Sequence, residues 1–319
     1  MLVLLWGLPA DSPLAAVHAQ LAGAGVPTRL IDQRDVLDTR VRLSVASALH
    51  GSVWVRGKQL VLDEVTAVYA RPYDSTRLPH LVAAGAGSQA QRQAAAVDAA
   101  LMSWCSMTPA LIVNPFEAMA SNSSKPFQLE QIRRLGWRVP ETLVTTDPAL
   151  AMAFWERHGE VIYKSVSGVR SQVSRLRSEH RARFDNIRSC PTQFQQHIAG
   201  TDFRIHVVGT ELFVCEIESA MDDYRYAPPE NVSSRRCRLP RQVEDDCRAL
   251  ASALHLWLAG IDLRRTPAGE WVCFEVNGSP GFTGFGPDST AEVAQAVARL
   301  LARGAVEPAA QPAQGAQAG

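Results

Sequence analysis

The stretch "WVCFEVNGSPGF", residues 271–282, decides the fold assignment, because a strand pattern carries two polar side chains and runs into a glycine-proline loop. Its first residues are aromatic, β-branched or apolar, which favours a strand. Side chains alternate between the two faces of a strand, so Glu275 and Asn277 are predicted to share one face. The other face would carry Val272, Phe274 and Val276.

The preceding segment "GIDLRR" (260–265) predicts the partner strand of a hairpin that turns at "TPAG" (266–269). With this turn, Arg265 pairs with Glu270 and Asp262 pairs with Cys273. Asp262 then lies diagonally across from Glu275 on the same face, about 7 Å away or less, unless a one-residue bulge changes the register.

Asp262, Glu275 and Asn277 supply only oxygen ligands, which hard cations such as Mg²⁺ prefer. Taken singly, each has a plainer interpretation, since an aspartate in a strand usually lies on a solvated face. Three oxygen ligands on one face of one hairpin favour a metal site.

Composition limits the possible functions. The chain has 319 residues, enough for two or three domains, and a formal net charge of zero, which gives no support for nucleic acid as a partner. No apolar run approaches the roughly 20 residues of a membrane span, and the apolar start reads as a buried strand rather than a signal peptide. We therefore expect a cytoplasmic protein with neither a nucleic acid nor a membrane as partner.

The six cysteines are irregularly spaced and form no Cys-x-x-Cys pair, so we expect reduced thiols rather than a zinc site. The histidines show no metal-ligand spacing either.

Lysine is rare in this chain. Of the 32 basic residues only three are lysines, at positions 58, 125 and 164, and the rest are arginines. Lys125 begins a predicted helix, and Lys164 lies in a predicted strand before a serine-glycine loop. A solvated helix end and a charged strand edge are the plain interpretations. The alternative is a crowded phosphate site, where a compact ammonium is not interchangeable with a guanidinium.

Residues 1–115 have the pattern of an α/β domain. Strand and helix signals alternate from the start, and Gly25 ends the first helix. The predicted strands are 2–6, 28–32, 41–46, 52–56, 59–62, 66–72 and 111–115, and the predicted helices are 12–24 and 88–106.

Two further regions follow, a central one at 116–191 and a C-terminal one at 192–304, and the low-complexity tail 305–319 is expected to be disordered. The basic run "SSRRCR" (233–238) is expected to be a solvated loop, with contact to an acidic peptide as the alternative. Predicted helices are 126–135, 148–158 with Asp147 as its cap, 241–257 and 289–303. Predicted extended segments and strands are 139–146, 161–166, 192–198, the hairpin 202–209 with 212–218, and the hairpin 259–265 with 270–277.

The ordered set "SKPFQL", "VIYKSVSG", "FQQHIAGTDFRIHVVG", "GIDLRR" and "FEVNGSPGF" resembles the ATP-grasp ligases, over about residues 112–303. It is most similar to the ribosomal-protein glutamate ligases and the maturases of ribosomally made peptides. The fold class implied is α/β (α+β), an ATP-grasp fold behind an N-terminal α/β pre-ATP-grasp domain.

The resemblance also implies roles for individual residues. Lys125 and Lys164 would hold nucleotide phosphates, and Asp202 would bind the ribose hydroxyls. Arg204, with Arg225 as a second candidate, would face the phosphate or acyl phosphate. A hinge formed by Gln196, His197 and Ile198 would read adenine through its backbone, with Gln196 where the family usually has glutamate. Asp262, Glu275 and Asn277 would hold one or two Mg²⁺ ions, with Mn²⁺ as an alternative.

The chemistry implied is carboxylate activation by ATP to an acyl phosphate, followed by attack of an amine. A peptide or amino-acid-like substrate is the preferred expectation, and "GSPGFTGF" after Asn277 varies with the acceptor in such enzymes. A small-metabolite ligase of glutathione-synthetase type and a non-catalytic ATP-binding module are the alternatives. The sequence also leaves open whether two copies of the chain form a homodimer.

Overall fold

The computed structural model describes residues 1–120, 124–166, 173–219 and 231–304. The chain divides into two compact units: residues 1–116 together with the segment from 294 onwards, and residues 117–293. The predicted division into three domains and a tail stays a prediction, and the tail lies outside the described residues.

The first unit contains a four-stranded parallel sheet in the order β2-β1-β6-β7. Leu4 and Trp6 of β1 pack with Leu101 and Trp104 of α3 in one apolar core. Alternation along the strand places Val3 and Leu5, which are also buried, on the opposite face. The elements are β1 (Val3–Gly7), α1 (Ser12–Gly23), β2 (Thr28–Asp32), β6 (Ala67–Arg71), α2 (Pro79–Ala83), α3 (Gln89–Met107) and β7 (Leu111–Val113).

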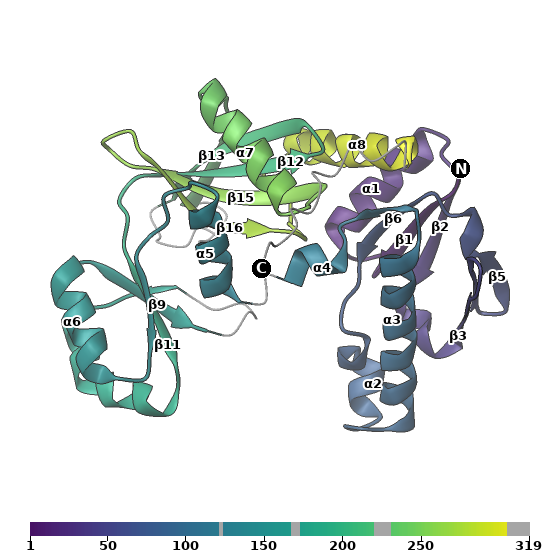
Figure 1. The fold of residues 1–319 in the computed structure, drawn as a ribbon, viewed down its shortest axis with the longest axis horizontal. Coiled ribbons are helices and arrows are strands. Elements are labelled where there is room, and N and C mark those ends of the chain that lie inside the picture. The colour runs from purple at the N-terminus through teal and green to yellow at the C-terminus, as the bar shows by residue number, and fades with distance from the viewer. Residues whose placement is uncertain (121–123, 167–172, 220–230, 305–319) are drawn as a thin grey trace, which may run out of the picture. The chain divides into compact units, whose positions relative to one another are not determined.

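A three-stranded antiparallel sheet completes this unit, formed by β3 (Thr39–Val45), β4 (Leu49–Val55) and β5 (Lys58–Val61). These elements confirm the predicted α/β pattern (Figure 1). Short 3₁₀ segments at 33–38, 62–64 and 75–77 connect them.

The second unit has two antiparallel sheets, shown with their helices in Figure 1. The first has the order β10-β9-β11-β8 and packs against α6, where Phe154 and Phe194 share a core. Its elements are α5 (Lys125–Arg134), β8 (Thr142–Thr145), α6 (Pro148–His158), β9 (Val161–Ser165), β10 (Ser174–Arg175), a 3₁₀ segment at 178–189 and β11 (Thr192–Gln196). Neither β10 nor the 3₁₀ segment is predicted from the sequence.

The second sheet has the order β14-β13-β12-β15-β16. Its core joins Ile205 and Ile261 of the central strands to Leu250 of α7. The elements are β12 (Thr201–Val208), β13 (Glu211–Ser219), β14 (Val232–Arg236), α7 (Arg241–Ala253), β15 (Leu258–Arg265) and β16 (Trp271–Asn277). The helix α4 (Phe116–Met119) begins at one unit boundary, and α8 (Pro287–Arg303) contains the other.

Both predicted hairpins of this sheet are confirmed, β12 with β13 and β15 with β16. The expected loop at 233–238 is wrong, because Val232–Arg236 forms the edge strand β14 against β13. Arg235 pairs there with Glu216 at 2.7 Å, which places the basic run opposite an acidic strand.

No helix in the described part of the chain is long and apolar enough to cross a membrane.

Two matched leucines test the core assignment. Leu250 on α7 is buried, whereas Leu150 on α6 is 54% exposed. We expect Leu250→Ala to lower the free energy of unfolding by about 2–5 kcal/mol, because it leaves a cavity in the core, and Leu150→Ala to change it by about 0.5 kcal/mol or less. Thermal and denaturant unfolding of both variants would measure this, and equal effects would contradict the assigned core.

Candidate functional site

A pocket in the second unit lies between its two sheets. Residues on β9 and β11 form one wall, and residues on β12, β15 and β16 form the other. Apolar and charged side chains share the lining: Ile162, Lys164, Val173, Gln195, His197, Ile198, Asp202, Phe203, Asp262, Leu263, Arg264, Phe274 and Glu275. A flat apolar group with a charged end fits such a lining.

Asp262 and Glu275 pair directly across the β15–β16 hairpin. The predicted register is therefore wrong: Leu263, not Asp262, pairs with Cys273, and Arg265 pairs with Trp271 instead of Glu270. Two shifts add up. The turn is one residue longer than predicted, which moves the pairs of Arg265 and Leu263 by one position, and a β-bulge between the Asp262 and Leu263 pairs, where Phe274 is the extra residue of β16, moves Asp262 by one more.

The bulge also changes which side chains share a face. Cys273 and Val276 lie in the core, whereas Phe274 and Glu275 both line the pocket. The prediction that Phe274 faces away from Glu275 is therefore wrong. The bulge brings an aromatic ring and two carboxylates to the same wall.

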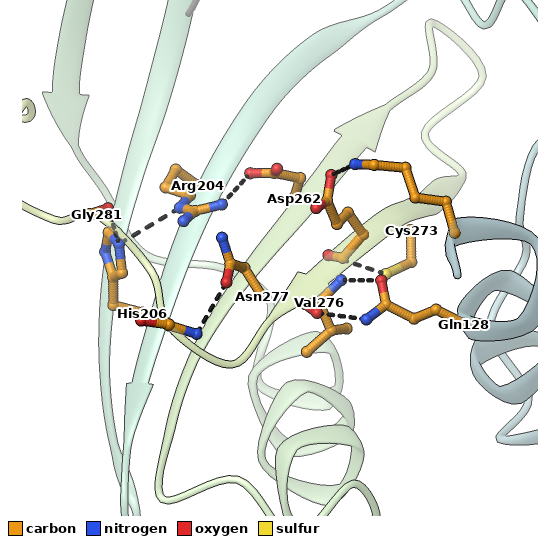
Figure 2. A network of polar contacts seen from close by, with 11 residues as sticks. Gln128, Arg204, His206, Asp262, Cys273, Val276, Asn277 and Gly281 are labelled. Atoms are coloured by element: carbon orange, nitrogen blue, oxygen red, sulfur yellow. Dashed lines mark hydrogen bonds and ion pairs between the residues drawn. The ribbon is translucent and has the colours of Figure 1, made fainter. Parts of the chain in front are cut away.

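Each carboxylate of this pair has a basic partner. Lys125 Nζ lies 2.9 Å from Glu275 Oε2. Arg204 Nη1 lies 2.7 Å from Asp262 Oδ1 (Figure 2). Like charges on adjacent strand positions repel, so the two cations stabilise the pair.

The helix that carries Lys125 is fixed to β16 by a glutamine. Gln128 Nε2 donates to the Val276 carbonyl at 2.6 Å, and Gln128 Oε1 accepts from the Val276 amide at 3.1 Å. Figure 2 shows this pair of hydrogen bonds beside the ion pairs. Gln128 thereby holds the N-terminal end of α5, with Pro126 in its first turn, against the carboxylate strand.

Arg204 is 6% exposed and crosses over the backbone of Gly260. A Cβ on Gly260 would lie 2.4 Å from Arg204 Nη2 and 2.6 Å from Pro280 Cβ. Only glycine leaves room for the guanidinium here. Asn277, which pairs with Gly260, accepts a hydrogen bond from the Ser279 amide at 2.8 Å, so its side chain also shapes the loop that follows.

His206 lies beside Arg204 in the core and contacts the same loop. Its Nε2 is 3.2 Å from the Gly281 carbonyl oxygen and 3.4 Å from Arg204 Nε. A single ring nitrogen can either donate to the carbonyl or accept from the guanidinium, but it cannot do both. Burial, and then the Arg204 charge, lower the pKa of His206 to about 3. The imidazole is therefore neutral at pH 7.

In the same pocket wall, Asp202 is held by Arg264. Arg264 Nε donates to Asp202 Oδ1 at 2.7 Å and Nη2 donates to Oδ2 at 2.8 Å. The third nitrogen, Nη1, donates to the Ile198 carbonyl at 2.7 Å.

Several backbone groups of the predicted hinge are already engaged. The Gln196 amide donates to the Glu141 carbonyl, and the His197 amide donates to the Glu160 carbonyl. The His197 ring lies 3.0 Å from Glu160 Oε2 and 3.0 Å from Arg175 Nη2. The predicted adenine reading by this hinge therefore needs amides other than these two, whereas the Ile198 carbonyl keeps a second lone pair after accepting from Arg264 Nη1.

The structure brings most of the predicted site residues together. Six of them line the pocket: Lys164, His197, Ile198, Asp202, Asp262 and Glu275. Lys125, Arg204 and Asn277 lie in the network behind or beside this wall, whereas Gln196 is not part of the lining. Arg225 lies outside the described residues.

Arg264, Gln128 and His206 are missed by the sequence reasoning. Arg264 stands inside a quoted motif, but its partner Asp202 is 62 residues away, and only the pairing of β12 with β15 brings them together. The contact between Gln128 and Val276 spans 148 residues and leaves no local signal.

The oxygen atoms available as metal ligands in this wall fit a hard cation in part. Asp262 and Glu275 put two carboxylates on the pocket wall, and Asn277 adds a carboxamide one pair further along the hairpin. Among the described residues no group of three or more His, Cys, Asp or Glu side chains could hold a metal ion. A site with two carboxylates suits Mg²⁺, which usually completes its coordination with water and substrate phosphates.

The cysteines do not provide a nucleophile for this pocket. All six are free, as predicted, and burial raises the pKa of the Cys247 thiol to about 12 and that of Cys273 well above its usual value. Both thiols stay protonated and pack in the core of the second sheet.

No protein-family model matches the sequence, and no curated protein matches it. Solved structures do. The macrocyclase MdnC from Microcystis aeruginosa MRC, bound with the precursor peptide MdnA, is 22% identical with a TM-score of 0.77, over 95% of this chain and 100% of that chain. A Chryseobacterium gregarium RiPP-associated ATP-grasp ligase, in complex with ADP and a leader and core peptide, is 18% identical with a TM-score of 0.78, over 95% and 96%.

The chain has the ATP-grasp fold. A further structure agrees: the ATP-grasp ligase PsnB, complexed with a phosphomimetic variant of a minimal precursor, Mg and ADP, is 24% identical with a TM-score of 0.77, over 94% of this chain and 97% of that chain. The predicted fold class is thus confirmed over nearly the whole chain, the N-terminal unit included.

A substitution at Gly260 tests the close packing of Arg204 and Pro280 over its backbone. We expect Gly260→Ala to destabilise the protein by about 1–3 kcal/mol, because the new methyl group must displace Arg204 or Pro280. Gly281→Ala is the matched control, since a Cβ there meets nothing within 4 Å. Unfolding curves of both variants measure the difference, and a neutral Gly260→Ala would contradict the close approach.

The lowered pKa of His206 predicts that the free energy of unfolding depends on pH. The unfolded chain protonates this histidine near 6.5 and the folded chain only near 3, so between these values the unfolded state binds the extra proton. Stability contributed by neutral His206 is therefore complete above pH 6.5 and falls as the pH decreases towards 3, by up to about 1.4 kcal/mol per pH unit. We expect His206→Gln to remove this part of the slope in unfolding experiments between pH 7 and 4. An unchanged slope would mean that His206 protonates normally in the folded protein.

Proposed function

We propose that this chain is an ATP-dependent carboxylate–amine ligase that acts on a peptide. The observation that carries the proposal is the carboxylate pair Asp262–Glu275 on the wall of a pocket whose other wall carries Lys164, within an ATP-grasp fold. The proteins of this fold named above support the peptide substrate, because their structures contain precursor, leader or core peptides.

In this proposal the apolar part of the pocket holds the adenine. Ile162 of β9 and Val173, just before β10, line it on one side, and Phe203 and Leu263 of the second sheet line it on the other. The ribose lies against Asp202, and the phosphates extend towards Lys164 and the carboxylate pair. Exclusion of water by these apolar side chains strengthens each charged contact at the phosphate end.

Asp262, Glu275 and Asn277 would hold Mg²⁺, which when bound neutralises the developing phosphate charge. Both carboxylates are already matched by basic side chains, so a divalent cation alone adds unbalanced positive charge. Metal and nucleotide are therefore expected to bind together. Lys125 would leave Glu275 and contact a phosphate oxygen when both bind.

Arg204 has a different task, since it is buried and fixed by Gly260, Pro280 and Asp262. Its fixed position suits the binding of the substrate carboxylate and of the acyl phosphate formed from it. The attacking amine then displaces phosphate and forms the amide. The protein contributes orientation and charge stabilisation rather than a nucleophile of its own.

The test is ADP and phosphate release from ATP and Mg²⁺ with a pool of candidate peptides. We expect Glu275→Gln and Asp262→Asn to reduce kcat on the order of 100-fold or more, because each removes a charged metal ligand. Glu270→Gln is the matched control, since Glu270 lies at the exposed end of the same hairpin in an ion pair with Arg138. Full activity of both site variants would contradict the metal assignment.

Two outcomes separate the peptide proposal from its alternatives. ADP release that depends on amino acids alone would favour a small-metabolite ligase. Nucleotide binding without turnover on any substrate would favour a binding module. Cytoplasmic location and the homodimer stay predictions.

A further inference from the structure

The side chain of Gln193 on β11 is completely buried, and neither its Nε2 nor its Oε1 has a hydrogen-bond partner among the described residues. Buried polar side chains are nearly always hydrogen-bonded, because a buried group without a partner costs free energy on folding. Gln193 therefore lowers the stability of the fold as it stands. A partner that comes into place only with a bound ligand would explain such a group.

Gln193 lies on the side of its sheet that forms the pocket wall. Side chains two positions apart on a strand share a face, and Gln195 lines the pocket. Gln193 pairs with Lys164 of β9, which also lines the pocket, and with Val144 of β8 on its other side. Gln193 itself is not among the described residues that line it, so it acts on a ligand through a neighbour rather than by direct contact.

Lys164 is the neighbour that can serve the buried oxygen. Val144 has no polar side-chain atom, and Gln195 Nε2 donates to Thr142 Oγ1 at 3.0 Å. Directly opposed strand positions have Cβ atoms about 4.5–5.5 Å apart, and the Lys164 ammonium carries three donors on a flexible four-carbon stem. It can donate one hydrogen to Gln193 Oε1 and keep two for phosphate oxygens.

The neutral carboxamide suits this task. A carboxylate opposite Lys164 would form an ion pair and compete with phosphate for the ammonium, whereas the carboxamide takes only one of its donors. Moving the ammonium towards a buried group costs solvation, which a phosphate charge beside it offsets. The buried oxygen gains a charged donor at the same time, so phosphate binding and this contact favour each other.

We propose that Gln193 is a positioning residue for Lys164: its carboxamide oxygen accepts a hydrogen bond from the ammonium when this ammonium binds a phosphate. The inference rests on the proposed function, in which Lys164 contacts the nucleotide phosphates. It follows that Gln193 raises the affinity for ATP although it lowers the stability of the fold, and that its effect on affinity depends on Lys164.

The test is calorimetric titration of the full-length protein with ATP and Mg²⁺, for the wild type, Gln193→Met, Lys164→Met and the double variant. Methionine is unbranched like glutamine but offers only a weak acceptor. We expect Gln193→Met to weaken ATP binding about tenfold, as loss of one hydrogen bond to a charged group predicts. In the Lys164→Met background the same change should alter ATP affinity by less than about twofold, because the two residues act on one contact.

Thermal unfolding without nucleotide separates this role from a purely structural one. Gln193→Met should leave the melting temperature unchanged or raise it, because it removes a buried group without a partner. Gln131 on α5 provides the matched control, since its Oε1 is also buried without a partner among the described residues, and it does not line the pocket. Gln131→Met should behave in the same way in unfolding but change ATP affinity by less than about twofold.

The outcomes separate this inference from the function on which it rests. If the wild type binds no ATP, the proposed function fails and the inference fails with it. If the wild type binds ATP but Gln193→Met binds it equally well, or weakens it by the same factor with and without Lys164, nucleotide binding stands and the positioning role is overturned. A lower melting temperature of Gln193→Met would show that the carboxamide already has a partner, such as a buried water, and would overturn the role as well.

Discussion

The structure of the site depends on two carboxylates that face each other across one bulged hairpin. Asp262 and Glu275 occupy directly opposed strand positions, where Cβ atoms are about 4.5–5.5 Å apart, and each side chain is 21% exposed. Such a pair would raise the free energy of the folded state if nothing opposed the repulsion. Lys125 from α5 and Arg204 from β12 do so, and this requirement ties a helix and two further strands to the hairpin.

The surroundings of these ion pairs keep their partners in place. Gln128 fixes α5 to the backbone of β16, and the bare backbone of Gly260 gives Arg204 its path. His206 stays neutral beside Arg204, so it adds no second charge to the buried side of the wall. The site is therefore built on sheet residues and their immediate supports, as a site with fixed charge geometry requires.

Much of the fold can be predicted from the sequence, because alternation and glycine or proline punctuation are local signals. The strands around "VIYK", "FRIHVV" and "GIDLRR" and the helices with Asp147 or Ser88 at their caps are of this kind. The ordered motifs indicate the ATP-grasp fold, which the structural comparison confirms. The predicted hairpin also places Asp262 and Glu275 on neighbouring strands, so that their position in one pocket wall could be expected.

The remaining features depend on contacts that no local pattern encodes. A bulge of one residue changes neither composition nor strand propensity, yet it moves Phe274 to the pocket and pairs Asp262 with Glu275. After Val232, the strand β14 has only polar and basic residues, and it forms because Glu216 and its neighbours lie beside it. The contact between Arg264 and Asp202 requires the register of β12 against β15.

The central claim is that the carboxylate pair and the basic residues around it form a site for a metal–nucleotide complex. The most direct test is calorimetric titration of the full-length protein with ATP, once with excess Mg²⁺ and once with EDTA. We expect one nucleotide to bind per chain, much more tightly with Mg²⁺ than without it, and Mg²⁺ alone to show no detectable binding. Nucleotide affinity that is the same with Mg²⁺ and with EDTA, or the absence of any nucleotide binding, would contradict it.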